Sequence, residues 1–254
     1  MATLANSLTS RLAWVSLRAA CRAAMRRVDL RVEGLEHVPV AGPAIIAARH
    51  YHHLYDGAAL LAMAPRPLRI VVTLDWLENP IGQRVMREAC RAAGWPIVPR
   101  SAVLGDQGIK QGRIPGAGRD LRVATRESVA LLRAGRMLLV FPEGYPTIDP
   151  GYTPKTRDDE VLPFRPGFLR FAALAERDGR TRVPVIPAGL AYTRGERWRL
   201  TVRFGEPLCV DAAVELDEQA KTVGRRVRQL SGLAAGPDRG SAAPPAEWQP
   251  RHGA

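Results

Sequence analysis

Three histidines and an aspartate lie close together in the segment RHYHHLYDG at positions 49–57. They are His50, His52, His53 and Asp56. A histidine and an aspartate a few residues apart can form a general base, in which the carboxylate fixes the imidazole tautomer and the free ring nitrogen removes a proton from a hydroxyl. An unperturbed histidine, with a pKa of about 6.5, suits that task at neutral pH. This segment is therefore a candidate catalytic site.

Other interpretations fit the same residues. Asp56 can be the N-cap of the following helix, a role compatible with the base pair, and the histidines can form a polar loop without a chemical role. A metal site is a third interpretation, because the three histidines resemble part of an H-x-H-x-D-H motif. Leu54 stands where that motif requires its aspartate, and only His37 and His252 remain elsewhere. We therefore expect no metal.

The surrounding elements alternate between strands and helices. Expected strands cover 28–33, 44–48, 69–74, 96–99, 137–141, 183–192 and 197–204. Expected helices cover 4–28, 57–64, 80–93, 120–133, 166–177 and 212–231. In the helix 80–93, an apolar stripe consists of Ile81, Val85, Ala89 and Cys90. Such alternation predicts an α/β fold with a mostly parallel central sheet flanked by helices. His50 follows the apolar strand 44–48, and open α/β sheets bind ligands where strands end.

The chain is strongly basic, with 37 Lys+Arg against 25 Asp+Glu in 254 residues and a net charge of +12. Such a charge attracts nucleic acid, an anionic membrane or phosphorylated small molecules. No window of 18 apolar residues occurs, so we expect no transmembrane span. The three cysteines are far apart, which excludes a disulfide framework and indicates a reducing compartment.

Residues 4–28 predict a basic amphipathic N-terminal helix. Its apolar stripe is Leu4, Leu8, Leu12, Val15 and Ala19. Arginines and Trp14 lie among them, so the helix either rests on an anionic membrane surface or packs on the core as an ordinary helix. Strand 197–204 adds a second basic face through Arg197, Arg199 and Arg203. We divide the chain into this helix at 1–28, a globular domain at 29–235 and a disordered tail at 236–254, and expect a mobile glycine-rich loop at 105–118.

Four segments occur in an order that resembles the glycerolipid acyltransferase family, whose best-known members are lysophosphatidate acyltransferases. They are the segment from His50 to Asp56, GWPIVPR ending at Arg100, FPEGYP at 141–146 and VPVIPAG at 183–189. The corresponding family blocks are N-H-x4-D, G-x5-R, F-P-E-G-T-R and V-P-x-x-P. The resemblance spans about 44–206 and implies that 29–235 is an acyltransferase domain.

Two departures from the family pattern bear on the site. Five residues, not four, separate the histidine from the aspartate, and Arg49 replaces the usual asparagine. We assign the base to His50 because it keeps the place at the strand end, with His52 and His53 as alternative bases. Pro146 stands where the family has the arginine thought to hold the acceptor phosphate.

The resemblance implies an O-acyltransferase. His50 would deprotonate the hydroxyl of a lysophospholipid of the 1-acylglycerol-3-phosphate type. The hydroxyl oxygen then attacks the thioester of acyl-CoA or acyl carrier protein. Asp56 holds the imidazole. Substrate binding is expected at Arg100, Phe141, Pro142, Glu143 and Gly144. Backbone N–H groups near Gly144 are candidate oxyanion donors, and Glu143 either holds the acceptor or the turn. No nucleophile signature such as G-x-S-x-G is present, so we expect direct transfer without a cofactor.

The expected partners are the acyl donor thioester, the lysolipid acceptor and an anionic membrane surface, at the cytoplasmic face and peripherally bound. Nucleic acid is not expected, because no zinc finger or RNP motif is present. Two alternatives remain: a family member that acylates a glycolipid or another lipid hydroxyl, and a non-catalytic basic protein that binds membranes.

Overall fold

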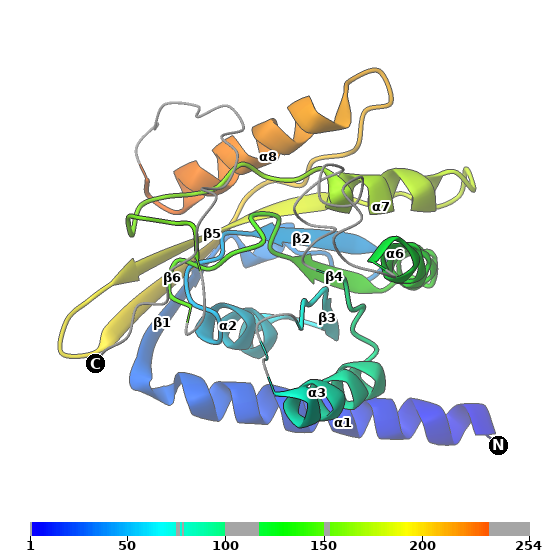
Figure 1. The fold of residues 1–254 in the computed structure, drawn as a ribbon, viewed down its shortest axis with the longest axis horizontal. Coiled ribbons are helices and arrows are strands. Elements are labelled where there is room, and N and C mark those ends of the chain that lie inside the picture. The colour runs from blue at the N-terminus through cyan, green and yellow to red at the C-terminus, as the bar shows by residue number, and fades with distance from the viewer. Residues whose placement is uncertain (1, 75–76, 78, 100–116, 150–152, 234–254) are drawn as a thin grey trace.

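A six-stranded sheet forms the centre of the fold in the computed structural model, which describes residues 2–74, 77, 79–99, 117–149 and 153–233 (Figure 1). The strands are β1 (Val28–Glu33), β2 (Ala44–Ala48), β3 (Leu68–Ile70), β4 (Met137–Val140), β5 (Val185–Thr193) and β6 (Trp198–Phe204). Their order is β1-β6-β5-β2-β4-β3. All neighbouring strands are parallel except the β5–β6 hairpin. The predicted mostly parallel sheet is confirmed.

Helices cover both faces of this sheet (Figure 1). They are α1 (Ala2–Ala24), α2 (Tyr55–Met63), α3 (Pro80–Ala93), α6 (Ala117–Arg133), α7 (Gly167–Glu176) and α8 (Leu216–Leu230). Side chains of β2 alternate between the two cores, with Ile46 and Ala48 packed toward α1 and α2, and Ile45 and Ala47 toward α6, α7 and α8. All five residues of β2 are buried, as expected for a central parallel strand. This strand ends immediately before Arg49 and His50.

Several boundaries differ from the expected ones. The expected strand 69–74 is only three residues long in β3, and segment 96–99 forms a single bridge between Ile97 and Val72. Prolines at both ends of that segment lack the N–H groups that would extend the ladder. The N-terminal helix ends at Ala24, and a short 3-10 turn precedes β1. The tail at 236–254 and most of the loop at 105–118 lie outside the described residues, while Ala117 and Gly118 belong to α6.

α1 packs on the core with a different face from the stripe predicted for it. Its packing side chains are Trp14, Leu17 and Cys21, and Met25 of the following 3-10 turn extends this face. Val15, a member of the predicted stripe, is 61% exposed, and Ala19 is also exposed. Of the two interpretations left open for the stripe, packing on the core therefore does not apply to Val15 and Ala19, which lie on an outer face. The side chains of residues 2–12 are outside what the structure describes.

Two arginines tie α1 to the end of α2. The Nε groups of Arg18 and Arg22 donate to the carbonyl oxygen of Ala62 at 3.2 and 3.4 Å. Cations at the C-terminal end of a helix satisfy its last carbonyls and interact favourably with its dipole. α1 is thus an integral layer of the domain. None of the described helices is both long and apolar enough to cross a bilayer.

The basic face predicted for β6 is largely paired. Because β1 lies in register with β6, Arg199 reaches Asp29 at 3.1 Å and Arg203 reaches Glu33 at 2.7 Å. Two of the three arginines of this face thus have an acidic partner on β1, and contact of the face with lipid headgroups stays a prediction. Exposed pairs of this kind add little stability.

Candidate active site

His50 and Asp56 meet at the carboxyl end of β2. Nδ1 of His50 donates to Oδ2 of Asp56 at 2.9 Å, and Asp56 has no exposed surface. His50 comes from the loop after β2, whereas Asp56 lies in the first turn of α2. The His50 side chain keeps 15% of its surface exposed. Since Nδ1 faces the carboxylate, Nε2 is the ring nitrogen left for a substrate hydroxyl.

Asp56 accepts three further hydrogen bonds. Its Oδ2 accepts the N–H of Tyr51 at 2.6 Å and that of His52 at 2.9 Å. Its Oδ1 accepts the hydroxyl of Tyr192 at 2.6 Å. Burial and the nearby carboxylate raise the pKa of Tyr192, so its hydroxyl stays protonated and acts as a donor. All these donors fix the orientation of the carboxylate.

The extra residue of the first block is accommodated in a loop held by Ile148, two residues after the third block. The N–H of Ile148 donates to the carbonyl of Tyr51 at 2.6 Å, and the N–H of His53 donates to the carbonyl of Ile148 at 3.1 Å. This loop turns the backbone so that the N–H groups of Tyr51 and His52 point at Asp56. The five-residue spacing therefore still brings His50 and Asp56 together.

The two other histidines of the cluster have different surroundings. Nδ1 of His52 accepts the N–H groups of Leu54 and Tyr55 at 3.2 and 3.4 Å, and so caps the start of α2. Burial, and next the neighbouring His53, lower the pKa of His52, which keeps its ring neutral and able to accept. The ring of His53 is exposed, with Nδ1 at 3.3 Å from the carbonyl of Ile148.

The N-cap interpretation of Asp56 is wrong in its details. The N-cap position of α2 is Leu54, and the side chain that accepts from the first N–H groups of the helix is His52. Asp56 lies within the first turn and holds the preceding loop instead. The described residues contain no group of three or more His, Cys, Asp or Glu side chains arranged as metal ligands.

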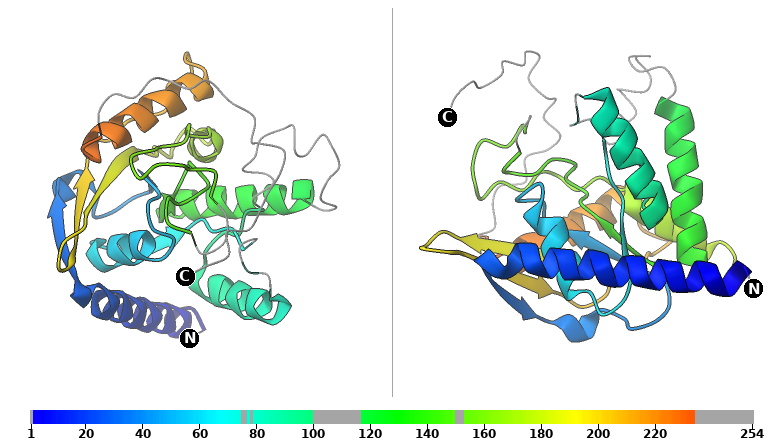
Figure 2. Two further views of the ribbon diagram at one scale, coloured as in Figure 1. Left: turned by 60° about the vertical axis from the view of Figure 1, so that its left-hand side comes forward. Right: turned by 90° about the horizontal axis from the view of Figure 1, so that it is seen from below.

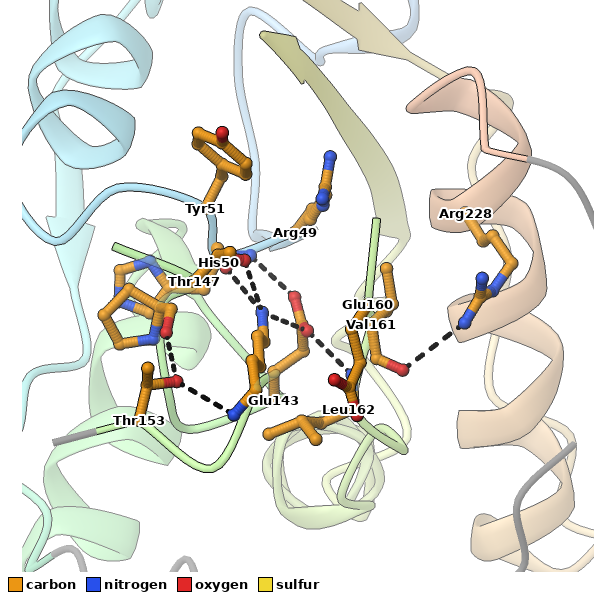
Figure 3. Close-up of polar contacts among 12 residues, drawn as sticks. Arg49, His50, Tyr51, Glu143, Thr147, Thr153, Glu160, Val161, Leu162 and Arg228 are labelled. Atoms are coloured by element: carbon orange, nitrogen blue, oxygen red, sulfur yellow. Dashed lines mark hydrogen bonds and ion pairs between the residues drawn. The ribbon is translucent and has the colours of Figure 1, made fainter. Parts of the chain in front are cut away.

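The third block supports His50 from two sides. The ring of Phe141 stacks on the imidazole with centroids 4.1 Å apart and planes inclined by 17°. Oε1 of Glu143 accepts the N–H of His50 at 2.7 Å, and Oε2 accepts the N–H of Leu162 at 2.9 Å (Figure 3). Glu143 is only 1% exposed. Because both oxygens of Glu143 are bonded to backbone N–H groups, Glu143 is better suited to holding the turn than to binding the acceptor.

Gly144 occupies a tight turn and does not offer its N–H to a substrate. Its φ is 76°, in the left-handed region that favours glycine. Its N–H donates to the carbonyl of Phe141 at 3.0 Å, and the carbonyl of Pro142 accepts the N–H of Arg165 at 3.2 Å. Among the backbone N–H groups near Gly144, that of Gly144 itself is therefore already used within the turn, and an oxyanion donor in this region stays a prediction.

A buried lysine, Lys155, lies outside the four blocks and also holds the backbone of His50. Nζ of Lys155 lies 2.6 Å from Oε2 of Glu143 and donates to the carbonyl of His50 at 2.7 Å (Figure 3). The side chains of Lys155 and Glu143 are both fully buried. Burial lowers the pKa of Lys155, while Glu143 opposes this effect. The backbone of His50 is thus held by an acid at its N–H and by a cation at its carbonyl.

The remaining predicted positions are separate from this network. Arg100 lies outside the described residues. The carbonyl of Pro146 accepts the hydroxyl of Thr153 at 2.6 Å. Arg49 is 2% exposed; its guanidinium donates to the carbonyls of Leu190, at 3.1 Å, and Asp158. It lies over the Tyr51 ring at 5.0 Å, so it joins the loop to β5 instead of facing the His50 side chain.

Fold and site together define an α/β enzyme that presents a histidine–aspartate pair at the end of its central strand. A model of the Acyltransferase family matches residues 29–191, and the chain belongs to that family. Among solved structures, the chain is similar to the 1-acyl-sn-glycerophosphate (LPA) acyltransferase PlsC from Thermotoga maritima. The TM-score is 0.61 at 20% identity, covering 89% of this chain and 82% of the other. The comparison with curated proteins gave no significant match.

Removal of the Tyr192 hydroxyl should slow acyl transfer without weakening substrate binding. We expect Tyr192→Phe to lower kcat about tenfold, because one hydrogen bond to a buried carboxylate is lost. KM should stay unchanged. Tyr55→Phe is the control, since Tyr55 stacks on His52 and is not bonded to Asp56 through its ring. An unchanged kcat in Tyr192→Phe would show that this hydroxyl does not help to position the pair.

Proposed function

We propose that this protein is an O-acyltransferase that moves a fatty acyl group from acyl-CoA or acyl carrier protein to a hydroxyl of a lysophospholipid of the 1-acylglycerol-3-phosphate type. The observation that carries the proposal is the 2.9 Å contact between Nδ1 of His50 and the buried Asp56. Membership of the Acyltransferase family supplies the reaction class. The printed activity of the Thermotoga maritima protein supports a lysophosphatidate acceptor.

The chemistry follows from the orientation of the ring. With Nδ1–H on Asp56, Nε2 of His50 accepts the proton of the acceptor hydroxyl while its oxygen attacks the thioester carbonyl. The resulting imidazolium is stabilised by the adjacent carboxylate. As the tetrahedral intermediate collapses, the C–S bond breaks and the proton passes to the departing thiolate. An ester and a free thiol are formed, and no acyl-enzyme is needed.

Binding of the donor remains a proposal based on the family blocks. Arg100 would form a bidentate clamp on phosphate oxygens of the donor or acceptor. Phe141 and Pro142 line the turn beside His50, where Phe141 also keeps the imidazole plane fixed. No cofactor is part of the proposed reaction.

A second acceptor class is favoured by Pro146. The family has an arginine at this position, and in this chain the backbone carbonyl of Pro146 instead binds Thr153. The described cations closest to His50, Arg49 and Lys155, are buried and bonded within the protein. A lipid hydroxyl without a neighbouring phosphate, such as that of a glycolipid, is therefore the second candidate acceptor.

We further propose that the protein acts as a peripheral protein on an anionic membrane at the cytoplasmic face. α1 is basic, and Val15 on its outer face is 61% exposed. An interfacial helix has this combination of arginines and outward apolar side chains. The lipid acceptor would then be reached from the membrane surface. A nucleic acid partner is not proposed.

The test is acyl transfer by the purified full chain with labelled acyl-CoA or acyl carrier protein. The acceptors are lysophosphatidate, other lysophospholipids and a glycolipid with a free hydroxyl, with products identified by mass spectrometry. We expect acylated lysophosphatidate with one free thiol released per ester. A product from the glycolipid alone would support the second acceptor class. The absence of any product from every pair would contradict the proposal and favour a non-catalytic membrane-binding protein.

A further inference from the structure

The apolar stripe of α3 faces solvent. Ile81 is 75% exposed and Val85 is 65% exposed, and Ala89 and Ala92 continue the same stripe. Only Cys90 of the stripe predicted from the sequence is buried. Large apolar side chains at this spacing on an outer face indicate a partner, because single exposed apolar residues are common but aligned ones are not.

The charge on α3 indicates what kind of partner this is. Arg84, Arg87 and Arg91 are all exposed, against one acidic residue, Glu88, which pairs with Arg91 at 2.6 Å. On a helical wheel, Arg84 and Arg87 lie between the apolar stripe and the side that packs on the protein. Apolar side chains flanked by arginines suit a layer of anionic headgroups over acyl chains. Pairing of two copies of this face would bring arginines together, which disfavours a dimer.

α3 lies on the same side of the molecule as α1. The two helices are in contact, and both views of Figure 2 place them together, while α7 and α8 cover the opposite face of the sheet. The exposed Val15 adds an apolar group from α1. The two helices thus lie on one side of the molecule, and each has exposed apolar side chains and arginines.

We propose that α3 is a second membrane-contacting helix, whose Ile81–Val85 stripe enters the headgroup boundary of a bilayer rich in anionic phospholipid. Arg84 and Arg87 bind the lipid phosphates. α3 and α1 together form one contact surface. This inference rests on the proposed function, since a lipid acceptor resides in such a bilayer.

The test measures binding of the full chain to phosphatidylcholine vesicles with and without phosphatidylglycerol by co-sedimentation. Val85→Asp should lower the fraction bound to phosphatidylglycerol vesicles about tenfold. Val214→Asp is the matched control, since Val214 is 43% exposed and precedes α8 on the opposite face. It should bind as the original chain does. Val85→Ser, a milder change, should give an intermediate loss, and thermal unfolding of each variant checks the fold.

Two outcomes would overturn the inference. One is equal vesicle binding by Val85→Asp and the original chain. The other is a dimer in sedimentation velocity that dissociates in Val85→Asp, which would make this face a protein interface. Acyl transfer to a short-chain, water-soluble acceptor should be unchanged in Val85→Asp, with a loss only for the acceptor in vesicles. If the original chain shows no acyl transfer, and Val85→Asp still loses vesicle binding, the proposed function is wrong but the membrane-contacting surface is supported.

Discussion

His50→Ala is expected to lower the rate of acyl transfer about a thousandfold. Its imidazole is the group that can take the proton from the acceptor hydroxyl, and general-base catalysis contributes rate factors of about that size. Asp56, held by four hydrogen bonds, would remain in place but without a base to orient. Initial rates with acyl-CoA and lysophosphatidate measure the effect.

The neighbouring histidines supply the controls. His53→Ala should keep near-normal activity, because the ring is exposed, lies against the Ile148 carbonyl and the His52 ring, and has no contact with Asp56 in the described structure. His52→Ala should lower stability by about 1 kcal/mol, the cost of a lost helix cap, while most activity remains. If acyl transfer survives in His50→Ala but is abolished in His52→Ala, the base is His52 and our assignment is wrong.

The sequence allows the main features of this site to be predicted because they are local. The run AIIAA is short, apolar and preceded by Gly42-Pro43, which predicts a buried strand with His50 just after its end. The first and third blocks meet because each follows one of two paired strands, β2 and β4. Tyr192 and Lys155 could not be found in this way. Tyr192 reaches Asp56 only because β5 lies beside β2, and Lys155 because a loop folds back under His50.

Amphipathic patterns predict that these segments are helices, but they do not predict which face of each helix packs on the core. α1 packs on the core through Trp14 and Cys21, which lie on a different face from Val15 and Ala19. Both faces contain apolar residues, so periodicity alone does not say which one meets the core. Partners on a neighbouring strand cannot be predicted from periodicity either. Arg199 and Arg203 of β6 are paired because β1 places Asp29 and Glu33 in register with them.

Glu143→Gln is expected to cost the fold about 3 kcal/mol of unfolding free energy. The amide oxygen can still accept from one of the two N–H groups that Glu143 holds, but the amide cannot neutralise Lys155, whose ammonium is fully buried. Removal of one partner from a buried ion pair leaves an uncompensated charge, which is strongly destabilising. Activity should fall as well, because Glu143 and Lys155 fix the backbone of His50 from both sides. Urea unfolding and initial rates measure the two effects.

The sign of the pH dependence distinguishes a charge effect from simple loss of packing. Burial already lowers the pKa of Lys155, and Glu143 is the group that opposes this shift. In Glu143→Gln the folded state therefore loses its lysine proton at lower pH than the unfolded state does. Stability rises with pH wherever the unfolded state binds more protons, so the deficit should shrink as the pH is raised toward the ordinary lysine pKa of about 10.4.

Two further variants make the interpretation specific. The double variant Glu143→Gln, Lys155→Met should recover stability relative to Glu143→Gln, because it removes the unpaired charge along with its partner. Asp159→Asn is the control: Arg157 and Asp159 form an ion pair of the same 2.6 Å length, but both side chains are exposed. Its loss should leave stability nearly unchanged, because water screens exposed pairs. A pH-independent deficit in Glu143→Gln, not rescued by Lys155→Met, would show that Glu143 stabilises the fold through its backbone hydrogen bonds alone.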